Sequence, residues 1–71
     1  MNPTQRLLRK IKNYIENNYR APKIIILSDY FKDLMIADSP FFELVEKQKE
    51  IETFTGIRVI TTRRNKIMEV Y

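Results

Sequence analysis

The sequence predicts a small α+β domain in which helices pack on one face of a three-stranded sheet. Three observations favour this class. The N-terminal segment carries apolar residues every three or four positions, and residues 23–27 form a short β-branched run. Residues 57–62 show the two-residue alternation of side chains that is typical of a strand. A chain of 71 residues rarely divides into two independent cores, so we expect one domain over residues 1–71.

The first element is an amphipathic helix that begins at Asn2 and Pro3. Asn2 is an N-cap residue, Pro3 suits the first helical position, and Gln5 is placed to complete a capping box. We expect the helix to end near residues 17–18, because Pro22 disfavours helical geometry in the residue before it. One apolar stripe runs along it: Leu7, Leu8, Ile11, Tyr14 and Ile15.

A strand and a short helix follow. Residues 23–27 lack a polar interruption after Lys23, which is typical of a strand covered on at least one face. Ser28 or Asp29 then caps a second helix. Its apolar members are Tyr30, Phe31, Leu34 and Met35.

The next segment predicts a third helix, from about Pro40 to Thr53. The cap-plus-proline pattern of residues 38–40 marks its start, and Gly56 is placed where a left-handed C-cap is expected. The spacing predicts one stripe on it: Phe41, Leu44, Val45, Gln48 and Ile51.

The C-terminal part predicts two strands joined by a basic turn. Ile57, Val59 and Thr61 fall on one face of the first strand, and the residues between them fall on the other. Residues 63–66 form the turn, with Asn65 suited to a positive φ, and residues 67–71 return as the last strand. If the first two strands are parallel, the helix pair is the crossover between them.

The amino-acid composition excludes several classes of functional site. The chain has no Cys, no His and a single Gly, which excludes disulfide scaffolds, zinc fingers, histidine-based catalysis and glycine-rich phosphate loops. Its carboxylates are interleaved with lysines, as on a solvated helix face. We therefore expect no catalytic residue, no metal site, no cofactor and no small-molecule substrate.

The net charge of +4 is unevenly distributed. Residues 1–23 carry six basic residues and one acid, residues 24–54 three and seven, and residues 55–71 four and one. Mixed charge of this kind serves solubility. It also predicts, as an alternative, a nucleic-acid-binding surface on a basic helix face and a basic hairpin tip. The candidate residues are Arg6, Arg9, Lys10, Lys12, Arg58, Arg63, Arg64 and Lys66.

A membrane partner is not expected. The longest aliphatic run is four residues, at 24–27, whereas a bilayer span needs roughly 20. The N-terminus has no stretch resembling a signal peptide, and Trp and Phe are absent from the apolar stripe of the first helix. These features favour a cytoplasmic protein.

Several hydrophobic residues are difficult to bury together. Phe41 and Phe42 are consecutive, so on a helix they point about 100° apart. Ile60 lies on the strand face opposite Val59, so a sheet covered on one side leaves it partly in water, together with Val70 or Met68. Small domains expose scattered apolar residues, but Phe41, Phe42, Ile60 and an open sheet edge also form a candidate protein interface.

Residues 22–71 resemble small accessory proteins of tailed bacteriophages. The similar features are the strand Pro22–Ser28 leading into a helix, and the step Phe54–Val59 that opens a hairpin. The resemblance implies a virion or assembly component, or a small protein that binds a host factor, located in the host cytoplasm or the virion. Our leading hypothesis is a non-catalytic interaction protein that self-associates, and nucleic-acid binding is the alternative.

Overall fold

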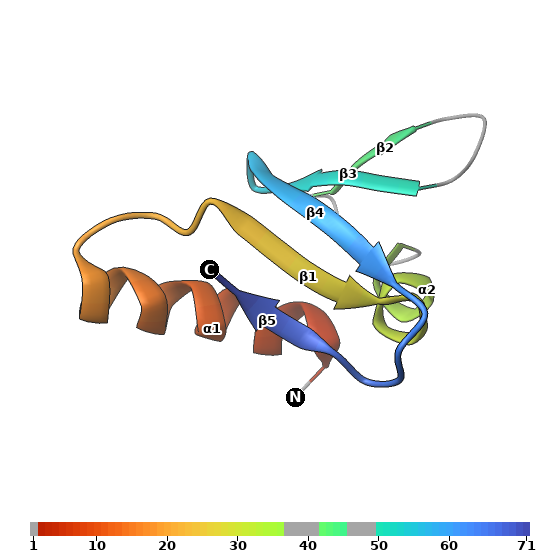
Figure 1. Cartoon of the computed structure of the whole chain (residues 1–71), viewed down its shortest axis with the longest axis horizontal. Helices are drawn as coiled ribbons and strands as arrows, with labels where there is room; N and C mark the ends of the chain where they lie inside the picture. Colours follow the sequence, from red (N-terminus) through yellow and green to blue (C-terminus); the bar gives the residue numbers. More distant parts are fainter. Residues whose placement is uncertain (1, 37–41, 46–49) are drawn as a thin grey trace.

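The computed structural model describes residues 2–36, 42–45 and 50–71, with the backbone alone at 42–45 and 50–52. Within these ranges the chain forms two helices and a five-stranded mixed sheet of order β2-β3-β4-β1-β5 (Figure 1). The elements are α1 (Pro3–Asn18), β1 (Ile24–Ser28), α2 (Asp29–Ile36), β2 (Phe42–Val45), β3 (Glu50–Phe54), β4 (Ile57–Thr62) and β5 (Met68–Val70). The predicted α+β class is confirmed.

The start of α1 has the predicted capping box. The Gln5 N–H donates to Oδ1 of Asn2 over 2.8 Å, and the Asn2 N–H donates to Oε1 of Gln5 over 3.3 Å. The helix ends at a left-handed Tyr19, with φ of 56°, whose N–H donates to the Ile15 carbonyl. Both ends of this helix are therefore stabilised by local hydrogen bonds.

β1 lies between two partners. It pairs in parallel with β4, so that Ile25 lies opposite Val59, and antiparallel with β5, so that Leu27 lies opposite Met68. The parallel arrangement required by the predicted crossover is present. β4 and β5 are not paired with each other, because β1 lies between them, so the predicted basic hairpin is wrong. In their connection the positive φ belongs to Lys66, at 54°, rather than to Asn65.

The predicted third helix over Pro40–Thr53 is also wrong, because β2 and β3 occupy the described part of this segment. The two strands pair antiparallel, and β3 continues into β4. Gly56 is not a helix cap. With φ of 82° it forms, together with Thr55 at 50°, a two-residue turn with positive φ at both central positions. Turns of that geometry match the twist of paired strands and thus favour a hairpin.

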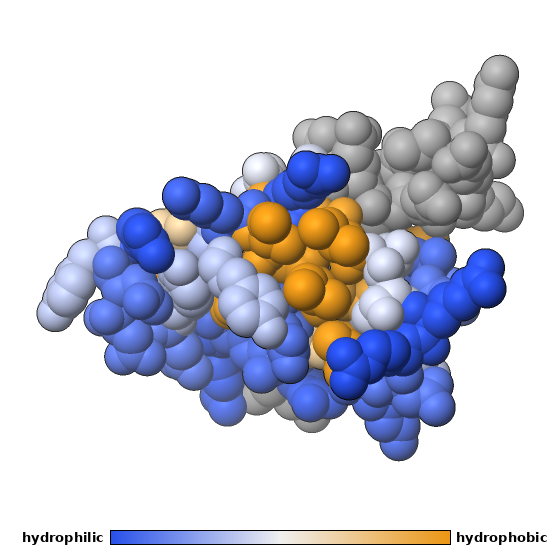
Figure 2. Space-filling view, viewed as in Figure 1, coloured by the Kyte–Doolittle hydropathy of each residue, from blue (hydrophilic) through white to orange (hydrophobic). Residues whose placement is uncertain are grey.

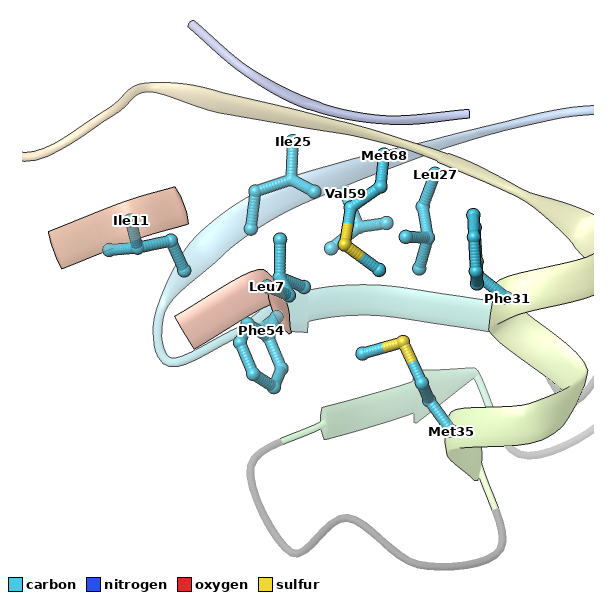
Figure 3. Close-up of a cluster of buried hydrophobic side chains, with 9 residues drawn as sticks. All are labelled: Leu7, Ile11, Ile25, Leu27, Phe31, Met35, Phe54, Val59 and Met68. Atoms are coloured by element: carbon cyan, nitrogen blue, oxygen red, sulfur yellow. The ribbon is translucent and has the colours of Figure 1, made fainter. Parts of the chain in front are cut away.

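One hydrophobic core holds the elements together (Figure 3). Both helices pack on one face of the sheet, as predicted, although the sheet has five described strands rather than three. The three predicted strands correspond to β1, β4 and β5, which are neighbours. The core residues are Leu7, Ile11, Ile25, Leu27, Phe31, Met35, Phe54, Val59 and Met68.

The turn between β3 and β4 gives a direct stability prediction. Gly56→Ala should destabilise the protein by about 1–2 kcal/mol, because the left-handed region is unfavourable for residues with a Cβ. No described heavy atom other than those of its chain neighbours lies within 4 Å of the added Cβ, so the cost is that of the backbone. Thr55→Asn should stabilise by about 0.5–1 kcal/mol, because Asn tolerates this region better.

The measurement is urea unfolding followed by circular dichroism. Opposite signs for the two substitutions are expected. A destabilising Thr55→Asn would contradict the assigned turn.

Candidate functional site

The face of the sheet opposite α1 and α2 has a hydrophobic centre. Ile24 and Ile26 of β1 are half-buried, and Ile60 of β4, which lies opposite Ile26, is 40% exposed. We call these three residues the open-face patch. Figure 2 shows hydrophobic side chains gathered in the middle of this face, over β1 and β4, with hydrophilic side chains around them.

The predicted exposure of Ile60 is confirmed, but its neighbours differ from those expected. Met68 is buried and Val70 packs against the core, because both lie on the helix-covered face. Ile24 and Ile26 take their place. Their signal in the sequence was the uninterrupted apolar run of β1, which makes both faces of that strand hydrophobic.

The structure does not place the side chain of either phenylalanine proposed for the same interface. Phe41 lies outside the described residues. Phe42 begins β2, opposite Phe54 of β3, but its side chain lies outside the description. Of the three predicted interface residues, Ile60 alone can therefore be placed on a surface.

Charged side chains of opposite sign flank the open-face patch. Arg58 of β4 lies opposite Ile24, and Glu69 of β5 lies opposite Ile26, and both are exposed. The Tyr71 hydroxyl donates to the Glu69 carboxylate. This hydrogen bond is the largest cause that raises the pKa of Tyr71, because it stabilises the neutral phenol, and desolvation and the negative charge of Glu69 raise the pKa further.

Two of the predicted basic residues come together although they are far apart in the sequence. Arg6 of α1 and Lys66 of the β4–β5 connection line one hollow of about 300 Å³, together with Tyr30 and Phe31 of α2. The Arg6 guanidinium carbon lies 5.4 Å from the centre of the Phe31 ring. The Lys66 ammonium lies 5.9 Å from that of Tyr30. Each cation is thus within the range of a cation–π contact.

Arg9 and Lys10 also contribute to a surface hollow. Together with Arg6 and Asn13 they line a second depression, of about 430 Å³, further along α1. Lys12 does not join them. It lies about 200° around the helix from Lys10 and forms a 4.0 Å ion pair with Glu16.

The remaining candidates are dispersed. Arg58 lies on the open face of the sheet, away from the helix layer. Arg63 and Arg64 are exposed in the β4–β5 connection, where the Arg64 N–H donates to Oγ1 of Thr62 over 3.3 Å. Of the eight candidates, the hollows therefore bring together Arg6, Arg9, Lys10 and Lys66. The other four do not line them: Lys12, Arg58, Arg63 and Arg64.

Tyr30 and Phe31 are adjacent, so on a helix they point about 100° apart and a core on one side cannot take both. The sequence does not decide which of the two is exposed. The structure buries Phe31 and leaves Tyr30 51% exposed, with the two rings in an edge-to-face contact. The approach of Lys66 to the Tyr30 ring depends on β5 pairing along β1, which the sequence does not reveal.

The described residues contain no cluster of three or more potential metal ligands. Within the same ranges, no helix combines the length and apolar character required to cross a membrane. Comparisons with family models, with curated proteins and with solved structures gave no match. Functional inference therefore rests on the chain's own surfaces.

The contact between Tyr71 and Glu69 gives a spectroscopic prediction. Glu69→Gln should lower the pKa of Tyr71 from its raised value, because the negatively charged acceptor is removed. The pKa is measured by NMR titration of the tyrosine ring carbons. Asp33→Asn in α2 is the control and should leave it unchanged. An equal pKa in Glu69→Gln and the parent protein would show that the contact is absent in solution.

Proposed function

We propose that the protein acts through protein–protein contacts, as a homodimer joined by the open face of its sheet. The observation that carries the proposal is the open-face patch, a set of adjoining isoleucine side chains on the sheet face opposite α1 and α2. Contiguous exposed apolar surface of this kind marks interaction sites more often than isolated apolar residues do. The role of a non-catalytic accessory or assembly component, which the phage resemblance implies, belongs to this proposal.

The charges around the patch favour a second copy of the chain as the partner. Arg58 and Glu69 lie on the two strands that flank β1. A twofold axis along β1 brings β4 of one copy against β5 of the other, so that each Arg58 approaches the partner's Glu69 side of the sheet. A surface with opposite charges on either side of an apolar centre is self-complementary, as a twofold interface requires.

The patch is small, so the dimer should be weak. Three isoleucines at the centre correspond to the lower end of the range of specific interfaces. We expect dissociation in the micromolar range, with the two copies exchanging readily.

Ile60→Glu should weaken dimerisation at least about tenfold, because it places a charge in the centre of the apolar contact and, with the axis along β1, opposite the partner's Glu69. Ile15→Glu is the matched control. Ile15 is 43% exposed, close to the 40% of Ile60, but it lies on α1. Sedimentation equilibrium from about 1 to about 500 µM measures both variants. A parent protein that stays monomeric, or equal association of both variants, would contradict the proposal.

A charge exchange tests the twofold arrangement. Arg58→Glu should weaken the dimer, because the introduced carboxylate then lies near the partner's Glu69, which is two residues further along the facing strand. Adding Glu69→Lys to the same chain should restore association, since the opposite pair is re-created with its signs exchanged. The same sedimentation measurement applies. If the double variant is weaker than Arg58→Glu alone, this pairing is wrong.

A further inference from the structure

We infer that the flank of α1 beside β5 is a binding groove for single-stranded nucleic acid. Three hollows follow one another along it, and neighbouring hollows share lining residues. Arg6 belongs to the first and second, and Lys10 and Asn13 to the second and third. Their volumes are about 300, 430 and 390 Å³. We call this series the α1 groove.

Cations and amides line the α1 groove at helical spacing. Arg6, Lys10, Asn13 and Asn17 recur every three or four residues and form one stripe. With a rise of 1.5 Å per residue, Arg6 and Asn17 are separated by about 16 Å along the helix axis. The stripe is therefore long enough to follow an extended backbone rather than a single anion.

The electrostatics favour a polyanion. Arg6, Arg9, Lys10 and Lys66 line the three hollows, and among the described lining residues Glu69 has the one acidic side chain. The Tyr71 hydroxyl already donates to that carboxylate. Phosphate groups that follow the stripe would thus meet four cations and amide donors, and binding would release counterions.

Aromatic rings lie at both ends of the groove. Tyr30, 51% exposed, lines the first hollow beside Lys66, and Tyr71, 55% exposed, lines the third beside Tyr14. Stacking on such rings needs the face of an unpaired base, which a duplex does not present. The combination of a cationic groove and exposed rings therefore points to a single strand.

This inference goes beyond the proposed dimer and does not depend on it. The open-face patch lies on the sheet face opposite α1 and α2, whereas the cations of the α1 groove lie on α1 and the β4–β5 connection. The basic residues also differ from those of the sequence prediction, because four of the eight do not line the three hollows: Lys12, Arg58, Arg63 and Arg64. A protein that fails to dimerise can still bind through α1.

The test is fluorescence anisotropy with a labelled oligothymidylate of about twelve nucleotides, compared with a duplex of equal length. We expect the single strand to bind at least about tenfold more tightly. Four phosphate contacts predict a slope near −2.8 for log affinity against log salt, or about 50-fold weaker binding at about 200 mM than at about 50 mM salt. Equal binding of duplex and single strand would overturn the inference, as would no binding.

Matched variants locate the site. Lys10→Ala should weaken binding and reduce the salt slope by about 0.7, whereas Lys12→Ala, on the other side of the same helix, should change neither. Tyr30→Ala should weaken binding about tenfold with the slope unchanged, whereas Tyr19→Ala, exposed outside the groove, should have no effect. Equal effects within either pair would overturn the inference. Competition by a polyglutamate peptide as strong as that by the oligonucleotide would do so too, because it would show unselective anion binding.

Discussion

The fold depends on the pairing of β1 with strands on both of its sides. β1 is parallel to β4 and antiparallel to β5, and it supplies Ile25 and Leu27 to the centre of the core. A parallel neighbour cannot follow through a short turn, so the chain must leave β1 and return from the opposite end. That requirement places α2 and the β2–β3 pair in the connection. It also leaves the near edge of β1 open for β5, which returns beside α1.

This arrangement makes more hydrophobic surface than the two described helices cover. β1 is apolar on both faces, as strands of buried parallel sheets are, but two helices cover only one of them. The core side chains lie under α1 and α2, while Ile24, Ile26 and Ile60 stay on the other face. A second copy of the chain would cover this face, which is the physical reason for the proposed self-association.

The elements set by local interactions were predictable, and those set by pairing were not. The capping box of Asn2 and Gln5 acts within one turn, so the start of α1 follows from the sequence. Residues 40–53 satisfy a helical spacing and also contain β-branched and aromatic residues, so periodicity alone did not decide between helix and strand. The hairpin turn at Thr55 and Gly56 favours strands over a helix in this segment, because it pairs β3 with β4. The candidate site shows the same division, because the basic residues are visible in the sequence but the approach of Lys66 to α2 depends on the order of the strands.

The fold also changes what the uneven charge means. The two basic segments are separated by an acidic middle in the sequence, yet the return of β5 brings Lys66 to the hollow that Arg6 lines. Like charges placed together oppose folding. Here the cations have partners of a different kind, since Arg6 lies over Phe31 and Lys66 over Tyr30. Aromatic rings attract the cations without neutralising them, so the positive potential stays available to an anionic ligand, whereas carboxylate partners would cancel it.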